Sequence, residues 1–211
     1  MRIRIILVAA AFAMLARPAL AQVSSAMPLP PAPGQKPVKE MVVEGDLVRV
    51  ALETGKGRIV LELDQGKAPI TVANFLAYLD KGWLDGQPFY RAMPYGDGGL
   101  IQGGVRDGGK QLPPIRTEPT GETGLKNVAG TIAMANGGPN TTRSDFFIMT
   151  TDIPAFDGPG GFAAFGRVAE GMDVVKAILA APTSPTLGEG VMKGQMLDPV
   201  VGIVKAARLK G

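Results

Sequence analysis

The sequence predicts a mainly β fold, in which a single barrel closes on itself and is capped by two α-helices. Short stretches of alternating apolar and polar residues recur along the chain and are separated by glycine-rich loops. Only two stretches have apolar residues at helical spacing, and no internal repeat is present. A closed barrel suits many short strands because closure removes exposed sheet edges.

The first two strands are expected at 47–54 and 57–64. In the first of them Val48, Val50 and Leu52 fall on one face, and the apolar residues of the second alternate in the same way. A Gly-Lys-Gly turn lies between the two stretches. The pattern therefore predicts an opening hairpin.

Two helices are expected farther along. The first begins at Pro69 and ends at Gly82, because proline favours a helix start and glycine a helix stop. The second begins beyond Gly171 and ends at Pro182. The apolar residues at helical spacing in the first helix are Val72, Phe75, Leu76 and Leu79. Further strands are expected at 88–93, 100–103, 130–135, 146–150, 162–168 and 200–209.

The N-terminal segment predicts export to the periplasm or the medium. Arg2 and Arg4 precede a short apolar run and a small-x-small motif, which is the layout of a signal peptide at 1–21. A retained membrane anchor is the alternative, but the apolar run is short for a bilayer. Prolines predict a flexible linker at 22–44, and the folded domain is expected at 45–211.

Composition excludes several classes of function. The chain has 22 Lys and Arg against 19 Asp and Glu, and three of the arginines lie within 1–21, so the remainder balances 19 against 19. Nucleic acid and anionic lipid are therefore not expected as partners. The chain has no histidine and no cysteine. Disulfides, Ser-His-Asp triads, Cys-His dyads and the usual zinc sites are thereby excluded.

One arginine stands in unusual surroundings. Arg91 lies between an aromatic pair and apolar residues, where a charge costs on the order of several kcal/mol unless a partner or a ligand meets it. From the bare sequence, a surface arginine paired with Asp97 or Asp107 is one interpretation. The other is a guanidinium that serves a bound ligand.

Several stretches together resemble the cyclophilin-type peptidyl-prolyl cis-trans isomerases. They are TVANFLAYLDKG, FYRAM, IQGG, GTIAMANGGPNTTRSDFFI, FDG and FAAFGRVAEGMDVVKAI. The resemblance covers about 47–209 in the right order, and the set is specific although each stretch alone would be weak. It implies an eight-stranded antiparallel barrel with a helix at each end. It also implies catalysis of X-Pro isomerisation without a metal or an organic cofactor.

The resemblance implies a role for two polar residues. Rotation about an X-Pro bond is slow because amide conjugation imposes a barrier of ~18–20 kcal/mol. Arg91 would donate a hydrogen bond to the prolyl nitrogen in the twisted state, and would thereby favour that state. Gln102 would hold Arg91 and the substrate backbone. An edge-strand glutamine facing water is the alternative for Gln102.

The resemblance also implies a proline pocket. Phe147 matches its aromatic floor, whereas alternation along the strand places Phe146 in the core. Ala135 and Asn136 match the pair that offers main-chain groups to the extended peptide. The remaining pocket positions that the resemblance implies are Leu100, Phe156 and Phe162.

Some pocket positions depart from the family pattern. Gly99 and Asp145 stand where an aromatic residue and a glutamine are usual, and Phe162 stands where a histidine is usual. Ala155 lies near the position of the tryptophan that strengthens cyclosporin binding, so weak drug sensitivity is expected. A non-catalytic module that binds proline segments, or a chaperone, is therefore the alternative to an isomerase. In either case the expected partners of this monomer are proline-containing segments of exported proteins.

Overall fold

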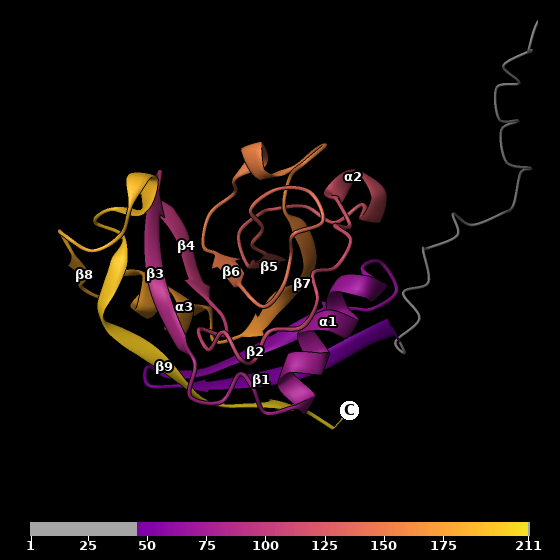
Figure 1. Cartoon of the computed structure of the whole chain (residues 1–211), viewed down its shortest axis with the longest axis horizontal. Helices are drawn as coiled ribbons and strands as arrows, with labels where there is room; N and C mark the ends of the chain where they lie inside the picture. The colour runs from indigo at the N-terminus through magenta and orange to yellow at the C-terminus, as the bar shows by residue number, and fades with distance from the viewer. Residues whose placement is uncertain (1–45, 211) are drawn as a thin grey trace, which may run out of the picture. The chain divides into compact units, whose positions relative to one another are not determined.

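The computed structural model describes residues 46–210, which form a β-barrel with helices packed against it (Figure 1). The signal peptide and linker predicted at 1–21 and 22–44 lie outside the described residues. The strands are β1 (Leu47–Thr54), β2 (Gly57–Asp64), β3 (Pro88–Tyr95), β4 (Gly98–Gly103), β5 (Thr131–Met134), β6 (Phe146–Met149), β7 (Ala163–Glu170), β8 (Thr183–Ser184) and β9 (Met196–Arg208). The helices are α1 (Pro69–Asp80), α2 (Thr120–Thr123) and α3 (Met172–Leu179), and short 3-10 turns lie at Pro154–Phe156 and Gly190–Met192.

The sheet is closed. Its strands follow the order β1-β2-β7-β5-β6-β4-β3-β9, and β9 also pairs with β1. The pairings are antiparallel, and β8 pairs only with β9. The predicted eight-stranded antiparallel barrel is thereby confirmed. The prediction missed β8 and α2, because elements of two and four residues carry too little periodicity to be recognised.

The opening hairpin follows the predicted alternation. Val48 faces Leu63 and Val50 faces Leu61 across β1 and β2. The inward residues Val50 and Leu61 are each at 0% exposure, whereas Val48, near the start of β1, is only partly buried against the same core. Directly opposed residues have side chains on the same face, so each pair adds to one apolar layer.

Both predicted helices cover the barrel interior. α1 packs against β2, β7 and β9, whereas α3 packs against β2, β3 and β4. Phe75 of α1 meets Phe146 of β6 edge-to-face at 5.4 Å between ring centroids. Val175 and Ile178 of α3 belong to the same core. Within residues 46–210, no helix is both long and apolar enough to cross a bilayer.

A buried carboxylate fixes the start of α1. Glu118 is 2% exposed and accepts hydrogen bonds from the backbone N–H of Thr71 at 2.8 Å and of Ile70 at 3.2 Å. It also accepts one from the Thr71 hydroxyl at 2.7 Å. A negative charge at a helix N-terminus accepts hydrogen bonds from the free N–H groups and is attracted to the positive end of the helix dipole. The loop that precedes α2 is thereby tied to α1.

Candidate active site

One row of residues crosses five strands and builds a single patch of the barrel's outer face. Arg91 on β3 lies opposite Met196 on β9 and Gln102 on β4. Gln102 in turn lies opposite Phe147 on β6, which lies opposite Ala133 on β5. The alternate residues of β4 and β6 belong to the interior core. Register therefore brings Arg91, Gln102 and Phe147 together on the outside of the barrel.

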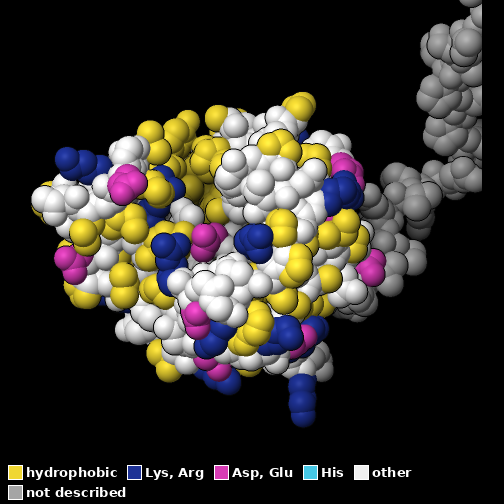
Figure 2. All heavy atoms as spheres, in the orientation of Figure 1, with side chains coloured by type: hydrophobic (Ala, Val, Ile, Leu, Met, Phe, Trp, Pro, Cys, Tyr) yellow, Lys and Arg dark blue, Asp and Glu magenta, His cyan; other side chains and the backbone are white. Residues whose placement is uncertain are grey.

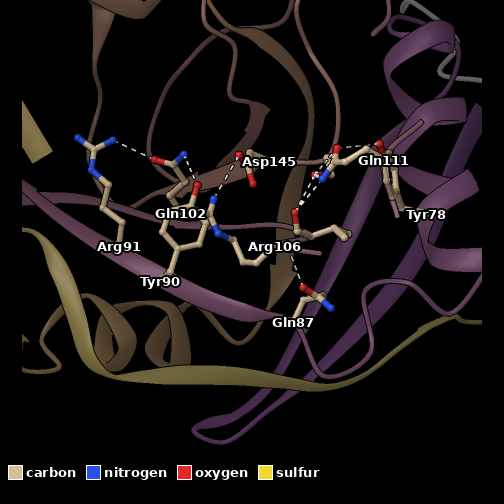
Figure 3. Close-up of polar contacts among 10 residues, drawn as sticks. Tyr78, Gln87, Tyr90, Arg91, Gln102, Arg106, Gln111 and Asp145 are labelled. Carbon is tan, nitrogen blue, oxygen red and sulfur yellow. Dashed lines mark hydrogen bonds and ion pairs between the residues drawn. The ribbon is translucent and has the colours of Figure 1, made fainter. Parts of the chain in front are cut away.

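A bulge lets two consecutive residues of β3 reach the same glutamine. The register of β3 against both neighbouring strands shifts between Phe89 and Arg91, which leaves Tyr90 unpaired. Arg91 Nη1 donates to Gln102 Oε1 at 2.9 Å, and Gln102 Nε2 donates to the Tyr90 hydroxyl at 2.7 Å (Figure 3). Tyr90 is only 7% exposed, and its burial raises the pKa of the phenol.

A residue that sequence reasoning missed holds the other side of Arg91. Gln195 Oε1 accepts from Arg91 Nε at 2.9 Å and from Nη2 at 2.7 Å. Nη2 also lies 3.3 Å from Met93 Sδ. Gln195 lies in a loop without any pattern and is 104 positions from Arg91 in sequence. Only the pairing of β3 with β9 brings the two residues together.

Arg91 keeps its charge without an acidic partner. In the part of the chain that the structure describes, no carboxylate lies within ion-pair distance of its guanidinium. Asp97 accepts a hydrogen bond from Thr151, and Asp107 pairs with Lys110, so neither meets Arg91. The guanidinium is half-buried, and this burial lowers its pKa from the ordinary value. Neutral amide oxygens therefore orient this cation.

An apolar cluster lies beside Arg91 and is separate from the barrel core. Its buried members are Leu100, Ala133, Phe147, Met149 and Ile153, and the residues packed against them are Met93, Ala135, Phe156 and Phe162. The structure thus places Leu100, Phe147, Phe156, Phe162 and Ala135 of the predicted pocket in one cluster. Met93 contacts both this cluster and the guanidinium.

Two phenylalanines cover the predicted pocket floor. Phe147 meets Phe162 at 5.2 Å and Phe156 at 5.6 Å between centroids, and all three rings contact one another edge-to-face. Phe147 itself is only 3% exposed. The two rings therefore pack onto Phe147 rather than surrounding an open floor. This geometry is favourable for aromatic rings and stabilises the cluster.

A buried asparagine holds these two phenylalanines in place. Asn127 is fully buried, and its Nδ2 donates to the carbonyl oxygens of Phe156 at 3.0 Å and Phe162 at 3.2 Å. The same group donates to Asp157 Oδ1 at 2.9 Å. Nothing in the sequence pattern pointed to Asn127, because its partners lie about 30 positions away. The loop before β5 thus supports the aromatic side of the site.

A cavity of about 500 Å³ adjoins Gln102, and Arg91 does not line it. Ala135 and Asn136 line it, as do Arg106 and Asp145. The Ala135 N–H already donates to the Asp145 carbonyl at 2.8 Å, which fixes the backbone here. In Figure 2 this face of the molecule is hollowed near its centre, where an acidic group lies between basic side chains.

Asp145, one of the departures from the family pattern, does not reach Arg91. Its carboxylate lies 3.9 Å from Arg106 Nη1, and the Arg106 guanidinium stacks 4.5 Å from the Tyr90 ring centroid. Burial raises the pKa of the Asp145 carboxyl, and Arg106 opposes that shift. Asp145 and Arg106 both line the neighbouring cavity, and the acid pairs with Arg106 rather than with Arg91.

The departure at Gly99 has a local cause. Its backbone has φ of +153°, and a Cβ there would collide with the carbonyl oxygen of Met93. Only glycine fits this close approach of β4 to β3. A side chain at this position would therefore require a different path for the β3–β4 connection. Ala155 is exposed at the 3-10 turn that presents Phe156.

Comparison with known proteins identifies the family. Residues 49–205 match the model of the family described as cyclophilin type peptidyl-prolyl cis-trans isomerase/CLD. The chain belongs to this family. A peptidyl-prolyl cis-trans isomerase of Streptomyces antibioticus is 38% identical over 173 residues, which cover 77% of this chain and 98% of that protein. One of Acinetobacter baylyi is 37% identical over 143 residues, which cover 64% of this chain and 73% of that protein.

Solved cyclophilins share the barrel. A cyclophilin-type isomerase of Cryptosporidium parvum superposes with a TM-score of 0.65 at 22% identity, covering 78% of this chain and 99% of that one. The same protein in the presence of the dipeptide Ala-Pro gives a TM-score of 0.63. This likeness agrees with the antiparallel barrel derived above.

The arrangement offers this cyclophilin a fixed hydrogen-bond donor beside an apolar surface. Arg91, Gln102 and Tyr90 form one polar network, and Phe147 with its neighbours forms the apolar part. Within residues 46–210, His, Cys, Asp and Glu nowhere gather in the number that a metal site needs. The individual catalytic and substrate-binding roles of these residues stay predictions.

Proposed function

We propose that the protein is a peptidyl-prolyl cis-trans isomerase that accelerates the folding of exported proteins. One observation carries the catalytic part of the proposal. Arg91 is half-buried, is held by two amide oxygens and lies beside the apolar cluster around Phe147. Such a site accepts a proline ring on its apolar side and donates a hydrogen bond on its polar side.

The guanidinium acts on the twisted amide rather than on the planar one. When the X-Pro bond rotates, the prolyl nitrogen loses conjugation and becomes a hydrogen-bond acceptor. A donor that meets this acceptor stabilises the transition state more than the ground state. Partial burial strengthens the interaction because water competes less for the charge. Each ~1.4 kcal/mol of such differential stabilisation raises the rate about tenfold.

Export supplies the second part of the proposal. The basic start, apolar run and small-x-small motif within 1–21 support a signal peptide, and the prolines of 22–44 support a tether. The absence of cysteine from the sequence makes folding independent of the redox state of the compartment. The clients are therefore proline-containing segments of periplasmic or secreted proteins. N-terminal sequencing of protein recovered from a cell envelope fraction tests this part, and an intact N-terminus in the cytoplasm contradicts it.

The activity is tested with an Ala-Pro tetrapeptide and the full-length protein. We expect acceleration by the parent and loss of at least about 100-fold in kcat/KM for Arg91→Ala, since the donor disappears. Arg116→Ala is the matched control, because it removes an exposed arginine that pairs with Glu122 on α2. Equal activity of Arg91→Ala and the parent would contradict the assigned role.

A second candidate function is a non-catalytic module that binds proline segments. The specific observation in its favour is the closed aromatic cluster, in which Phe156 and Phe162 leave Phe147 only 3% exposed. Such a module would bind the tetrapeptide without accelerating its isomerisation. A peptide titration of the folded parent, read beside the rate measurement, separates the two functions.

A further inference from the structure

We propose that Gln195 is a positioning residue, which orients the guanidinium of Arg91 for the twisted amide. The proposal rests on the isomerase function proposed above. Gln195 Oε1 accepts two hydrogen bonds from Arg91, from Nε at 2.9 Å and from Nη2 at 2.7 Å. A single oxygen that receives two N–H groups of one guanidinium fixes its rotation as well as its position.

The donors of Arg91 are almost fully used. A guanidinium has five N–H donors and no acceptor. Two go to Gln195, one goes to Gln102, and one on Nη2 points to the Met93 sulfur, which is a weak acceptor. The donor that remains is the second N–H of Nη1. Gln195 and Gln102 together therefore select which N–H group is free for a substrate.

The backbone around Gln195 is itself anchored to the strand that carries Arg91. The Gln195 carbonyl accepts from the Ala92 N–H at 2.9 Å, and its own N–H donates to the Met192 carbonyl at 3.0 Å. The next residue, Met196, lies directly opposite Arg91 in the β3–β9 pairing. The guanidinium is thus held from β4 by Gln102 and from the start of β9 by Gln195.

Both holding groups are neutral amides. A carboxylate in either place would orient the guanidinium but would also offset its positive charge. An amide oxygen provides the geometry and leaves the net charge available to the substrate. Gln195 lies outside the apolar cluster and does not line the cavity of about 500 Å³ next to Gln102. Its loss should therefore slow the reaction without weakening peptide binding.

The test compares the full-length parent with Gln195→Leu, which removes the acceptor at similar volume. NMR measures the cis-trans exchange rate of a bound Ala-Pro peptide and the Kd of that peptide. It also measures how fast the Arg91 Nε–H exchanges with water, and this signal is assigned by its absence from the spectrum of Arg91→Ala. We expect the isomerisation rate of the bound peptide to fall about tenfold, with a Kd within about twofold of the parent. The Nε–H should exchange at least about tenfold faster. Val191→Ala is the control, because Val191 is 85% exposed on the same loop and should match the parent.

Three outcomes would overturn the proposal. They are an unchanged isomerisation rate in Gln195→Leu, a rate that falls only in proportion to peptide binding, and an unchanged Nε–H exchange. If Gln195→Leu does not fold, Gln195→Asn is used instead, because its shorter side chain draws the amide oxygen away from Arg91. We then expect the same changes in isomerisation rate and Nε–H exchange, but smaller ones. A parent without activity would contradict the proposed function instead, and the Nε–H exchange would then decide alone whether Gln195 holds Arg91.

Discussion

Arg91 and Gln102 lie directly opposite each other on β3 and β4, and Gln102 Oε1 accepts a hydrogen bond from Arg91 Nη1 at 2.9 Å. Because arginine offers only donors, the amide oxygen of Gln102 has to face it. The amide nitrogen is then left to donate to the Tyr90 hydroxyl at 2.7 Å. The barrel wall thus determines the orientation of the cation before any substrate arrives.

Arg91→Lys should lose most of the isomerase activity although it keeps the charge. The arginine binds Gln102 and Gln195 simultaneously, and lysine, which lacks the planar fork, cannot do so in the same geometry. We expect kcat/KM to fall on the order of 100-fold, while the unfolding midpoint in urea stays close to that of the parent. The rate is measured on an Ala-Pro tetrapeptide. Activity above half that of the parent would show that charge alone is sufficient.

Phe146→Ala and Phe147→Ala should differ although the two residues are neighbours. Phe146 is fully buried in the barrel and meets Phe75 and Phe89 edge-to-face, so its removal should cost about 3–5 kcal/mol of unfolding free energy. Phe147 lies in the smaller apolar cluster outside the barrel core, so a smaller loss is expected. Peptide affinity should fall at least about tenfold only for Phe147→Ala. Urea unfolding and peptide titration measure the two effects, and equal loss of affinity in both variants would contradict the assignment.

The fold could be predicted from the sequence because the buried residues of this barrel recur at the spacing of local strands and helices. β1 and β2 have the predicted bounds, and α1 starts at Pro69 as predicted. β9 begins at Met196, earlier than predicted, because its first residues pair with β3 and β8 without a continuous apolar pattern. Alternation marks a strand only where one face is buried along its whole length.

The site was predictable only in part. Arg91, Gln102 and Phe147 lie in stretches that resemble the family, and register places them on one face. Gln195 and Asn127 carry no such signal, because their function in the site depends on partners that are distant in sequence. The covering of Phe147 by two other rings was also missed, since a sequence does not reveal how side chains of separate loops pack.

Glu118→Ala should destabilise the domain more than the substitution of an exposed polar residue does. The variant leaves the buried backbone N–H and hydroxyl of Thr71 without their acceptor, and it also removes the acceptor of the partly buried Ile70 N–H. We expect a loss of about 2–3 kcal/mol of unfolding free energy, measured by urea denaturation. Glu122→Ala is the control, because Glu122 forms an exposed pair with Arg116 and should cost little. A Glu118→Ala variant as stable as this control would contradict the role of Glu118 as a helix cap.

Asp145→Asn should gain stability relative to the parent as the pH rises. Burial raises the pKa of Asp145 in the folded state above its value in the unfolded chain. The folded state therefore keeps this proton to a higher pH than the unfolded chain does. The parent loses stability as the pH rises from the unfolded-state pKa to the folded-state pKa. Asparagine does not titrate, so the variant avoids this loss. Unfolding free energies measured between about pH 3 and pH 7 test the trend, and a difference that stays flat or falls would contradict it.

Asp80→Asn should show the opposite dependence on pH. Hydrogen bonds from Arg208 Nε at 2.8 Å and Nη2 at 2.6 Å lower the pKa of Asp80, which ends α1 and is tied by them to β9. This contribution is present above the unfolded pKa and disappears as the pH falls through the folded one. Because the pair is exposed, the variant should be less stable by at most about 1 kcal/mol at neutral pH and low salt. That deficit should vanish near pH 2 and shrink in concentrated salt. A deficit that persists under both conditions would mean that Asp80 stabilises α1 by some route other than its charge.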